Sequence, residues 1–227
     1  MRVAELFEPH RFRLVEKPAS EPGPGEVQVR VEAVGVCGSD LHYFAEGGVG
    51  YTPCVYPMVL GHEPAGVVTR VGPGVSGWAP GDRAALEPAL YCYHCEFCLS
   101  GRHNVCANLR FFSTPQDPGF FRDYVNLPAH NLLPLPADLS CQEATLFEPL
   151  AVDVLEIHRR QQHRREARTA HRVGADLAGE GKQDVGTGDG DDRLDFVVRD
   201  VADMEQASLG GLDEEQAYAA LRKLAME

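Results

Sequence analysis

Residues 91–106 read YCYHCEFCLSGRHNVC and contain Cys92, Cys95, Cys98 and Cys106 at the spacing C-x2-C-x2-C-x7-C. Four thiolates at this spacing can surround one tetrahedral metal ion from a single short lobe, as in closed structural zinc sites. Disulfides are the alternative explanation. The odd total of seven cysteines and the lack of a signal-peptide pattern at the start of the sequence argue against them. The stretch therefore predicts a structural zinc site.

The sequence on both sides of this lobe has the pattern of a β domain. Apolar and polar side chains alternate over residues 27–33, which is the period of a half-buried strand. Short apolar runs follow at 65–68, 83–86 and 124–127, separated by turns rich in glycine and proline. Many short strands joined in this way predict a barrel or a sandwich for residues 1 to about 153.

The composition changes after this domain. Residues 158–172 read HRRQQHRREARTAHR, and the following stretch to about residue 205 is rich in glycine and aspartate. Neither buries enough apolar surface to offset the entropy of ordering. We expect three segments: a zinc-binding domain over 1–157, a charge-rich and poorly ordered segment over 158–206, and a short amphipathic helix over 207–227.

The overall charge limits the classes of partner. The chain has 227 residues and a formal net charge of −13, which disfavours nucleic acid and anionic membranes as main partners. No run of about 18 apolar residues is present to span a bilayer. We expect a cytoplasmic protein, because a reducing compartment keeps metal-binding cysteines free of disulfides.

A second group of chemically active side chains lies outside the lobe. GVCGSDLHYF at 35–44 and GHE at 61–63 contribute most of its members, and FEPL at 147–150 adds a glutamate. The candidate residues are Cys37, Ser39, Asp40, His42, Tyr43, His62, Glu63 and Glu148. A thiolate, an imidazole and one or two carboxylates that leave a position open are what a catalytic zinc needs. Alone, each has an ordinary explanation, such as a core cysteine or a polar surface pair.

Together, these motifs resemble a known family. G-H-E-x-x-G at 61–66, followed by VGPGV at 71–75, is similar to the zinc signature of the medium-chain alcohol dehydrogenases. The CGSDLHYF segment, the four-cysteine lobe and the later Glu-Pro-Leu follow in that family's order. The sorbitol (polyol) dehydrogenase branch is the most similar, and the threonine and other sugar-alcohol dehydrogenases are the alternatives because not every sorbitol dehydrogenase keeps the lobe. The resemblance covers residues 1 to about 153. It implies a mainly β, GroES-like, partly open barrel.

The resemblance also implies a ligand set for a catalytic zinc. Cys37 and His62 would be ligands, and Glu63 would be the third. Glu148 would bind the metal directly or through a water molecule, and could replace Glu63 in another state of the site. Both carboxylates remain candidates for the direct ligand.

Further roles follow from the same resemblance. Ser39 would hydrogen-bond the substrate hydroxyl, and His42 would pass its proton towards solvent. Asp40 would orient a ligand histidine. Tyr43 and Phe112 would line the substrate cleft.

The implied activity is oxidation of a secondary alcohol or polyol to a ketone with NAD(P), and the family is compatible with a homo-oligomer. The dinucleotide would need a Rossmann domain soon after Glu148, with an apolar strand followed by G-x-G-x-x-G. The nearest glycine string, Gly186, Gly188 and Gly190, has Asp191 at the third glycine position and polar neighbours. We therefore expect no cofactor-binding residues, a missing Rossmann domain and a truncated dehydrogenase.

Other functions remain open. The chain could be a non-catalytic zinc-binding barrel or a damaged gene product, since the basic run after residue 157 has the composition of an out-of-frame reading. A third alternative is a fusion, because GLDEEQAYAALRKLAME at 211–227 resembles part of an RNA-binding ANTAR domain. The particular alcohol and the choice between NAD and NADP are left open.

Overall fold

The computed structural model describes residues 1–154 and 196–198. Two compact units divide the chain, one formed by Met1–Phe147 with Asp195–Glu227 and the other by Glu148–Leu194. Within the second unit, the described residues 148–154 are helical. All the elements named below belong to the first unit.

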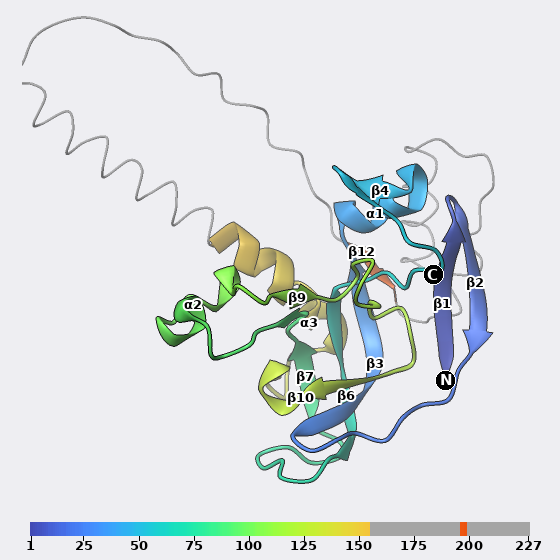
Figure 1. Cartoon of the computed structure of the whole chain (residues 1–227). Helices are drawn as coiled ribbons and strands as arrows, with labels where there is room; N and C mark the ends of the chain where they lie inside the picture. Colours follow the sequence, from blue (N-terminus) through green and yellow to red (C-terminus); the bar gives the residue numbers. More distant parts are fainter. Residues whose placement is uncertain (155–195, 199–227) are drawn as a thin grey trace, which may run out of the picture. The chain divides into compact units, whose positions relative to one another are not determined.

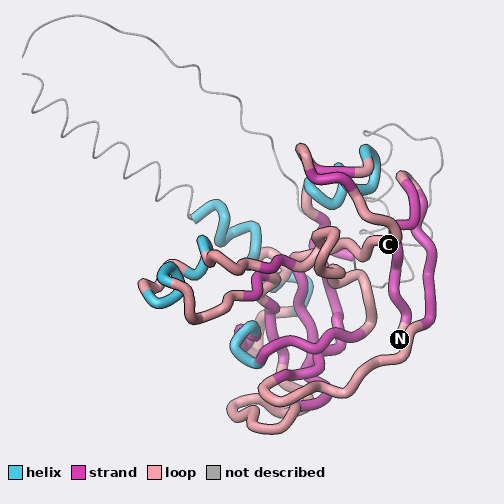
Figure 2. Tube along the Cα trace, in the orientation of Figure 1, coloured by secondary structure: helices cyan, strands magenta, loops and turns pink. Residues whose placement is uncertain are grey.

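Strands dominate this unit (Figures 1 and 2). They are β1 (Arg2–Glu8), β2 (Arg11–Glu16), β3 (Glu26–Val36), β4 (Gly48–Val49), β5 (Thr52–Pro53), β6 (Glu63–Val71), β7 (Arg83–Leu86), β8 (Ala89–Leu90), β9 (Arg110–Phe111), β10 (Tyr124–Pro128), β11 (Leu132–Pro134) and β12 (Phe196–Val198). The helices are α1 (Gly38–Glu46), α2 (Glu96–Leu99) and α3 (Cys141–Ala144), with 3-10 turns η1 (His103–Val105) and η2 (Ala129–Asn131).

The main sheet has the order β10-β3-β6-β7-β11, and β12 pairs with β3 as well. Every strand pairing in the described part of the chain is antiparallel. The four runs predicted as strands lie in β3, β6, β7 and β10, so the mainly β prediction is confirmed. β3 is central because its alternating apolar residues face the core while both of its edges pair with other strands.

The hydrophobic core lies between the main sheet and the β1–β2 hairpin. Phe120 and Phe121 are fully buried together with Leu6 and Leu60, and the Phe121 carbonyl accepts the Ala4 N–H at 2.9 Å. A smaller cluster of Ala33, Ala65, Ala85, Cys141 and Ala144 lets α3 approach the sheet closely. Small side chains are needed there because the helix backbone lies near the strands.

β12 differs from the expectation for the segment over 158–206. The sequence predicts no strand there, yet Phe196–Val198 pair with β3. Phe-Val-Val consists of residue types that favour strands. A run of only three such residues between charged neighbours is too short to predict a strand from the sequence. The expected disorder of the rest of that segment, the helix over 207–227 and the domain boundary near 157 lie outside the described residues. Among the described residues, no helix is both long and apolar enough to cross a membrane.

Candidate functional site

The four cysteines form a compact lobe that leaves the domain after β8 and returns through β9, which pairs with β8. Their sulfur atoms all lie within 4.8 Å of one another. Cys98 and Cys106 are buried, whereas Cys92 and Cys95 are partly exposed. Such a group of four thiols has the donor set and the proximity of a closed tetrahedral zinc site.

Backbone N–H groups point at these sulfur atoms. The Cys95 N–H donates to Cys92 Sγ at 3.4 Å and the Cys98 N–H to Cys95 Sγ at 3.5 Å. The Asn108 N–H donates to Cys106 Sγ at 3.4 Å. A separate hydrogen bond from the Asn108 side chain, together with further donors, lowers the pKa of Cys92 to about 5. These donors favour the thiolate at Cys92, which is the form that binds a metal, whereas burial and the neighbouring cysteines raise the pKa of Cys98 to about 12.

The second group joins the two central strands of the sheet. Cys37 follows the last residue of β3 and is the N-cap of α1, His62 precedes β6, and Glu63 is the first residue of β6. The register of the two strands places Gly35 opposite Glu63. One ligand atom each from Cys37, His62 and Glu63 lies within 4.8 Å of the other two. Pairing of β3 with β6 thus brings together residues that are distant in the sequence.

Glycines make room for this group. A Cβ atom at Gly35 would overlap Oε2 of Glu63, so only glycine leaves space for the carboxylate. Gly61 has a φ of +87°, and a Cβ atom there would lie 2.7 Å from the Phe121 ring. Gly35 is therefore required by lack of space, and Gly61 by lack of space together with its positive φ.

Asp40 lies beneath the group and is 3% exposed. Its Oδ2 accepts the Cys37 N–H at 3.1 Å, and its Oδ1 accepts the Gly61 N–H at 3.0 Å and the Ser113 hydroxyl at 3.1 Å. Oδ1 is also 3.7 Å from Nδ1 of His62. Asp40 therefore holds the backbone beside two ligand residues and faces the ring of one of them.

Cys37, His62 and Asp40 shift one another's pKa values towards the charged forms. Burial by itself lowers the pKa of His62, but the charge and hydrogen bonding of Asp40 and Cys37 outweigh it and raise the pKa to about 11. Burial raises the pKa of the Cys37 thiol, whereas hydrogen bonds from His62 and Ser39 lower it more, so the net shift is downward. A metal ion bound here would take the place of the imidazole proton and stabilise the thiolate.

The remaining predicted residues lie in different surroundings. Ser39 and His42 are on α1, and Nδ1 of the half-exposed His42 lies 2.8 Å from Oε1 of Glu46. Tyr43 and Phe112 are buried in the main hydrophobic cluster, 7% and 8% exposed. The roles given to these four residues stay predictions.

Glu148 belongs to the other compact unit, so its carboxylate is not placed relative to the Cys37 group. Its role as an alternative ligand therefore stays a prediction.

Gly35 and Ser113 were not singled out from the sequence. Ser113 has a positive φ of 66° and is 5% exposed, and its link to Asp40 spans 73 residues. The position of Gly35 two residues before Cys37 was visible in the sequence. Its need to be glycine depends on the strand opposite, which only the register reveals.

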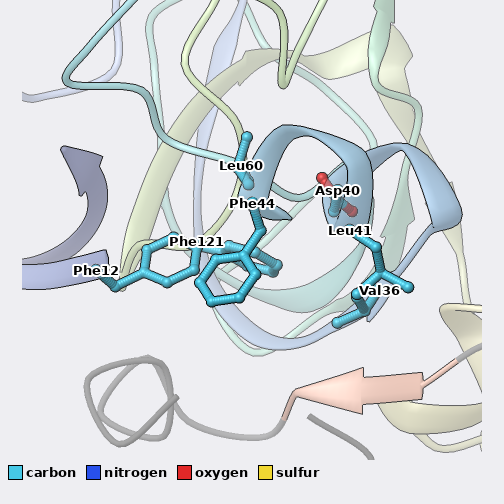
Figure 3. A pocket seen from close by; sticks show the side chains of 7 residues that line it. All are labelled: Phe12, Val36, Asp40, Leu41, Phe44, Leu60 and Phe121. Atoms are coloured by element: carbon cyan, nitrogen blue, oxygen red, sulfur yellow. The ribbon is translucent and has the colours of Figure 1, made fainter. Parts of the chain in front are cut away.

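A small pocket lies beside α1 and is lined by Phe12, Val36, Asp40, Leu41, Phe44, Leu60 and Phe121 (Figure 3). Its lining is apolar except for Asp40, and the stacked rings of Phe12 and Phe44 form one part of it. A polyol needs several hydrogen-bonding partners, so we do not assign this pocket to such a substrate.

Both cysteine-containing groups fit zinc. The lobe offers four sulfur donors and no other ligand type, which is the set of a structural site. The second group offers sulfur, nitrogen and carboxylate oxygen, which is the mixed set of an open catalytic site. An antiparallel domain with one closed and one open donor set of this kind has the features of a zinc-binding domain.

Comparison with known proteins gives the family. Residues 23–137 match the alcohol dehydrogenase GroES-like domain, and the chain belongs to this family of medium-chain zinc alcohol dehydrogenases. The resemblance noted in the sequence and the GroES-like fold class are thereby confirmed. NAD(P) is the family's dinucleotide cofactor.

Individual relatives agree with this assignment. Sorbitol dehydrogenase of Gallus gallus is 43% identical over 143 residues, which are 63% of this chain and 40% of that protein. Galactitol-1-phosphate dehydrogenase from Escherichia coli has a similar structure, with a TM-score of 0.64 and 32% identity over 71% of this chain and 45% of that one. A structure of an alcohol dehydrogenase from Escherichia coli CFT073 complexed with NADH has a TM-score of 0.58 and 34% identity, over 66% and 42% of the two chains. This chain spans less than half the length of each of these relatives.

Proposed function

We propose that this domain binds and activates the alcohol in a zinc-dependent polyol dehydrogenase of the sorbitol dehydrogenase type. The observation that supports the proposal most is the convergence of Cys37, His62 and Glu63 on one point, with Asp40 beneath them. In this proposal Cys37, His62 and Glu63 hold the catalytic zinc, with Glu148 as the alternative carboxylate. Cys92, Cys95, Cys98 and Cys106 hold a structural zinc.

Zinc on the Cys37 group supplies a Lewis acid that lowers the pKa of an alcohol. The chain then has to remove the hydroxyl proton. Ser39 and His42 are three residues apart on α1, which places them on one face of the helix. In our proposal Ser39 Oγ takes the substrate hydroxyl proton while its own proton passes to the ring nitrogen of the half-exposed His42 that does not face Glu46. His42 then releases this proton to solvent.

The substrate class is proposed from the relatives. Sorbitol dehydrogenase and galactitol-1-phosphate dehydrogenase both act, by their names, on open-chain sugar alcohols or their phosphates. We propose a secondary alcohol of this class as the substrate and NAD(P) as the hydride acceptor. Tyr43 and Phe112 would line the cleft from the core side. A cytoplasmic location, where thiolate ligands stay reduced, fits the two cysteine-containing sites.

Cobalt substitution tests alcohol binding without a dinucleotide. Co²⁺ in place of zinc gives a visible spectrum that reports its ligands, and we expect sorbitol or xylitol to change the spectrum of the Cys37 site. Cys37→Ser should abolish the change. Cys54→Ser, at a partly buried cysteine outside both metal groups, is the matched control and should leave it intact. A spectrum indifferent to every polyol tested would contradict the proposal.

Turnover by the chain alone is a separate question. The sequence from residue 153 to 227 contains no G-x-G-x-x-G, so we expect no measurable oxidation of polyols with NAD or NADP. Positioning the acceptor contributes roughly 7–11 kcal/mol to such reactions, and a dinucleotide free in solution lacks that positioning. Zinc-dependent turnover that disappears in Cys37→Ser would show that the chain binds the acceptor itself.

A further inference from the structure

One edge of β3 is covered by two different strands. β10 pairs with the first half of β3, from Glu26 to Arg30, and the last contact of this kind is the Val31 N–H donating to the Asp123 carbonyl at 2.9 Å. The segment that contains β10 does not pair with β3 after Val31. β12 pairs with the last three residues of β3, Val34–Val36.

The register of β12 connects it with the Cys37 group. Val197 lies opposite Gly35, and Gly35 lies opposite Glu63 on the other side. Phe196 lies opposite Val36, the residue directly before Cys37. Figure 3 shows Val36 on the side of the pocket that faces the β12 arrow. A row of three strands therefore runs from β12 through Gly35 to Glu63.

We propose that β12 is a positioning element for the metal site: its pairing with Val34–Val36 keeps Cys37 and Glu63 in the arrangement that binds zinc. The inference rests on the metal site of the proposed function, but not on its substrate. It goes beyond that function because residues 196–198 lie outside the residues that match the family domain.

The physical reason lies in the backbone. Val34, Gly35 and Val36 are buried, and buried backbone N–H and C=O groups need partners. Without β12, one edge of these residues would lose its strand partner, and the end of β3 would gain freedom next to Cys37. Residues that do not bind the metal can still hold its ligands in place. Removing such a residue typically lowers the affinity of the site for the metal by roughly 10–100-fold.

The test uses the full chain. Val197→Pro removes the N–H at the residue opposite Gly35 and disfavours strand pairing. Val201→Pro, at a valine four positions further on, is the matched control for the substitution itself. Zinc affinity of both sites is measured by competition with a chelator. We expect two zinc ions in each protein, with the weaker site at least about tenfold weaker in Val197→Pro than in Val201→Pro and wild type.

Different failures give different answers. Equal affinities in all three proteins would overturn the positioning role and leave the proposed function standing. A wild-type chain that binds only one zinc would overturn both. Val197→Gly keeps the N–H and serves as a milder variant if Val197→Pro does not fold, and it should weaken the same site to a smaller extent. An unchanged site in Val197→Gly, together with fast amide exchange of Val34–Val36 in wild type, would also overturn the inference.

Discussion

Asp40 joins three parts of the sequence that meet at the Cys37 group. It accepts hydrogen bonds from the N–H groups of Cys37 and Gly61 and from the Ser113 hydroxyl. Burial raises the pKa of its carboxyl, but His62 and these donors lower it more, so the net shift is downward. A buried carboxylate in this position acts on the metal site through the groups it orients.

Asp40→Asn is expected to weaken zinc binding at the Cys37 site by roughly 10–100-fold while the four-cysteine site stays full. The asparagine amide has only one oxygen, so its NH₂ group would face an N–H donor whose hydrogen bond Asp40 now accepts. Two donors facing each other cannot form a hydrogen bond. Glu46→Gln is the matched control, because Glu46 is exposed and pairs only with His42 among the interactions described. Metal titration monitored by calorimetry measures both sites. A similar loss in both variants would contradict the role of Asp40.

Gly35→Ala should displace the Glu63 carboxylate, since a Cβ atom would overlap Oε2. We expect zinc to be lost from the Cys37 site and retained by the four-cysteine site. Gly38→Ala is the control, because a Cβ atom there meets nothing within 4 Å. Zinc content after gel filtration distinguishes the two variants. If Gly35→Ala keeps two tightly bound zinc ions, Glu63 is not a ligand.

The cysteine lobe is tied to the second site through β9. Phe111 lies in this strand, and its ring centroid is 5.7 Å from that of His62. Ser113 follows shortly after and donates to Asp40. The return segment 110–113 thus contacts His62 and also Asp40, the carboxylate next to the Cys37 group. Unfolding of the lobe would therefore disturb contacts of the other site, whereas loss of the second metal removes no ligand from the lobe.

Removal of single ligands should show this asymmetry. Cys98→Ser is expected to abolish zinc at the lobe, unfold it and partly weaken the Cys37 site through Phe111 and Ser113. Cys37→Ser should remove only the second metal. Zinc stoichiometry and amide exchange over 89–111 measure the two effects. Equal loss of both metals in each variant would contradict the assignment of two separate sites.

Acid stability is a property of the whole domain. The pKa values of Glu5, Asp40 and Glu143 are all lowered in the folded protein. A carboxyl group with a lowered pKa stabilises the fold above its unfolded pKa, and this contribution is lost as the pH falls through the folded value. We therefore expect the stability of the domain to decrease below about pH 4.5, the ordinary value for glutamate.

Glu5→Gln isolates one part of this effect. Glu5 is 4% exposed and pairs with Lys17 at 2.6 Å and Arg13 at 3.0 Å. The substitution should cost about 1–3 kcal/mol of unfolding free energy at pH 7, and the difference from wild type should shrink as the pH falls below about 4.5. Glu16→Gln, at an exposed glutamate paired with the N-terminus, controls for the loss of a surface charge. Urea unfolding at several pH values gives both numbers. A difference that does not change with pH would contradict the ionic role of Glu5.

The strands and the four-cysteine group could be predicted because each has a local sequence pattern. The strands of the main sheet were visible because side chains alternate between two faces along each strand. The four-cysteine group was visible because all its members lie between residues 92 and 106. In both cases the signal is local, because it lies in the alternation within one strand or in the spacing within one short lobe.

The Cys37 group could be proposed from the sequence only through the resemblance to a family. Its geometry depends on the pairing of β3 with β6, which places Glu63 beside Gly35. The link between Ser113 and Asp40 and the pairing of Val197 with Gly35 depend on tertiary structure in the same way. Strand register and contacts between distant segments result from packing of the whole domain, and no local pattern of residues contains them.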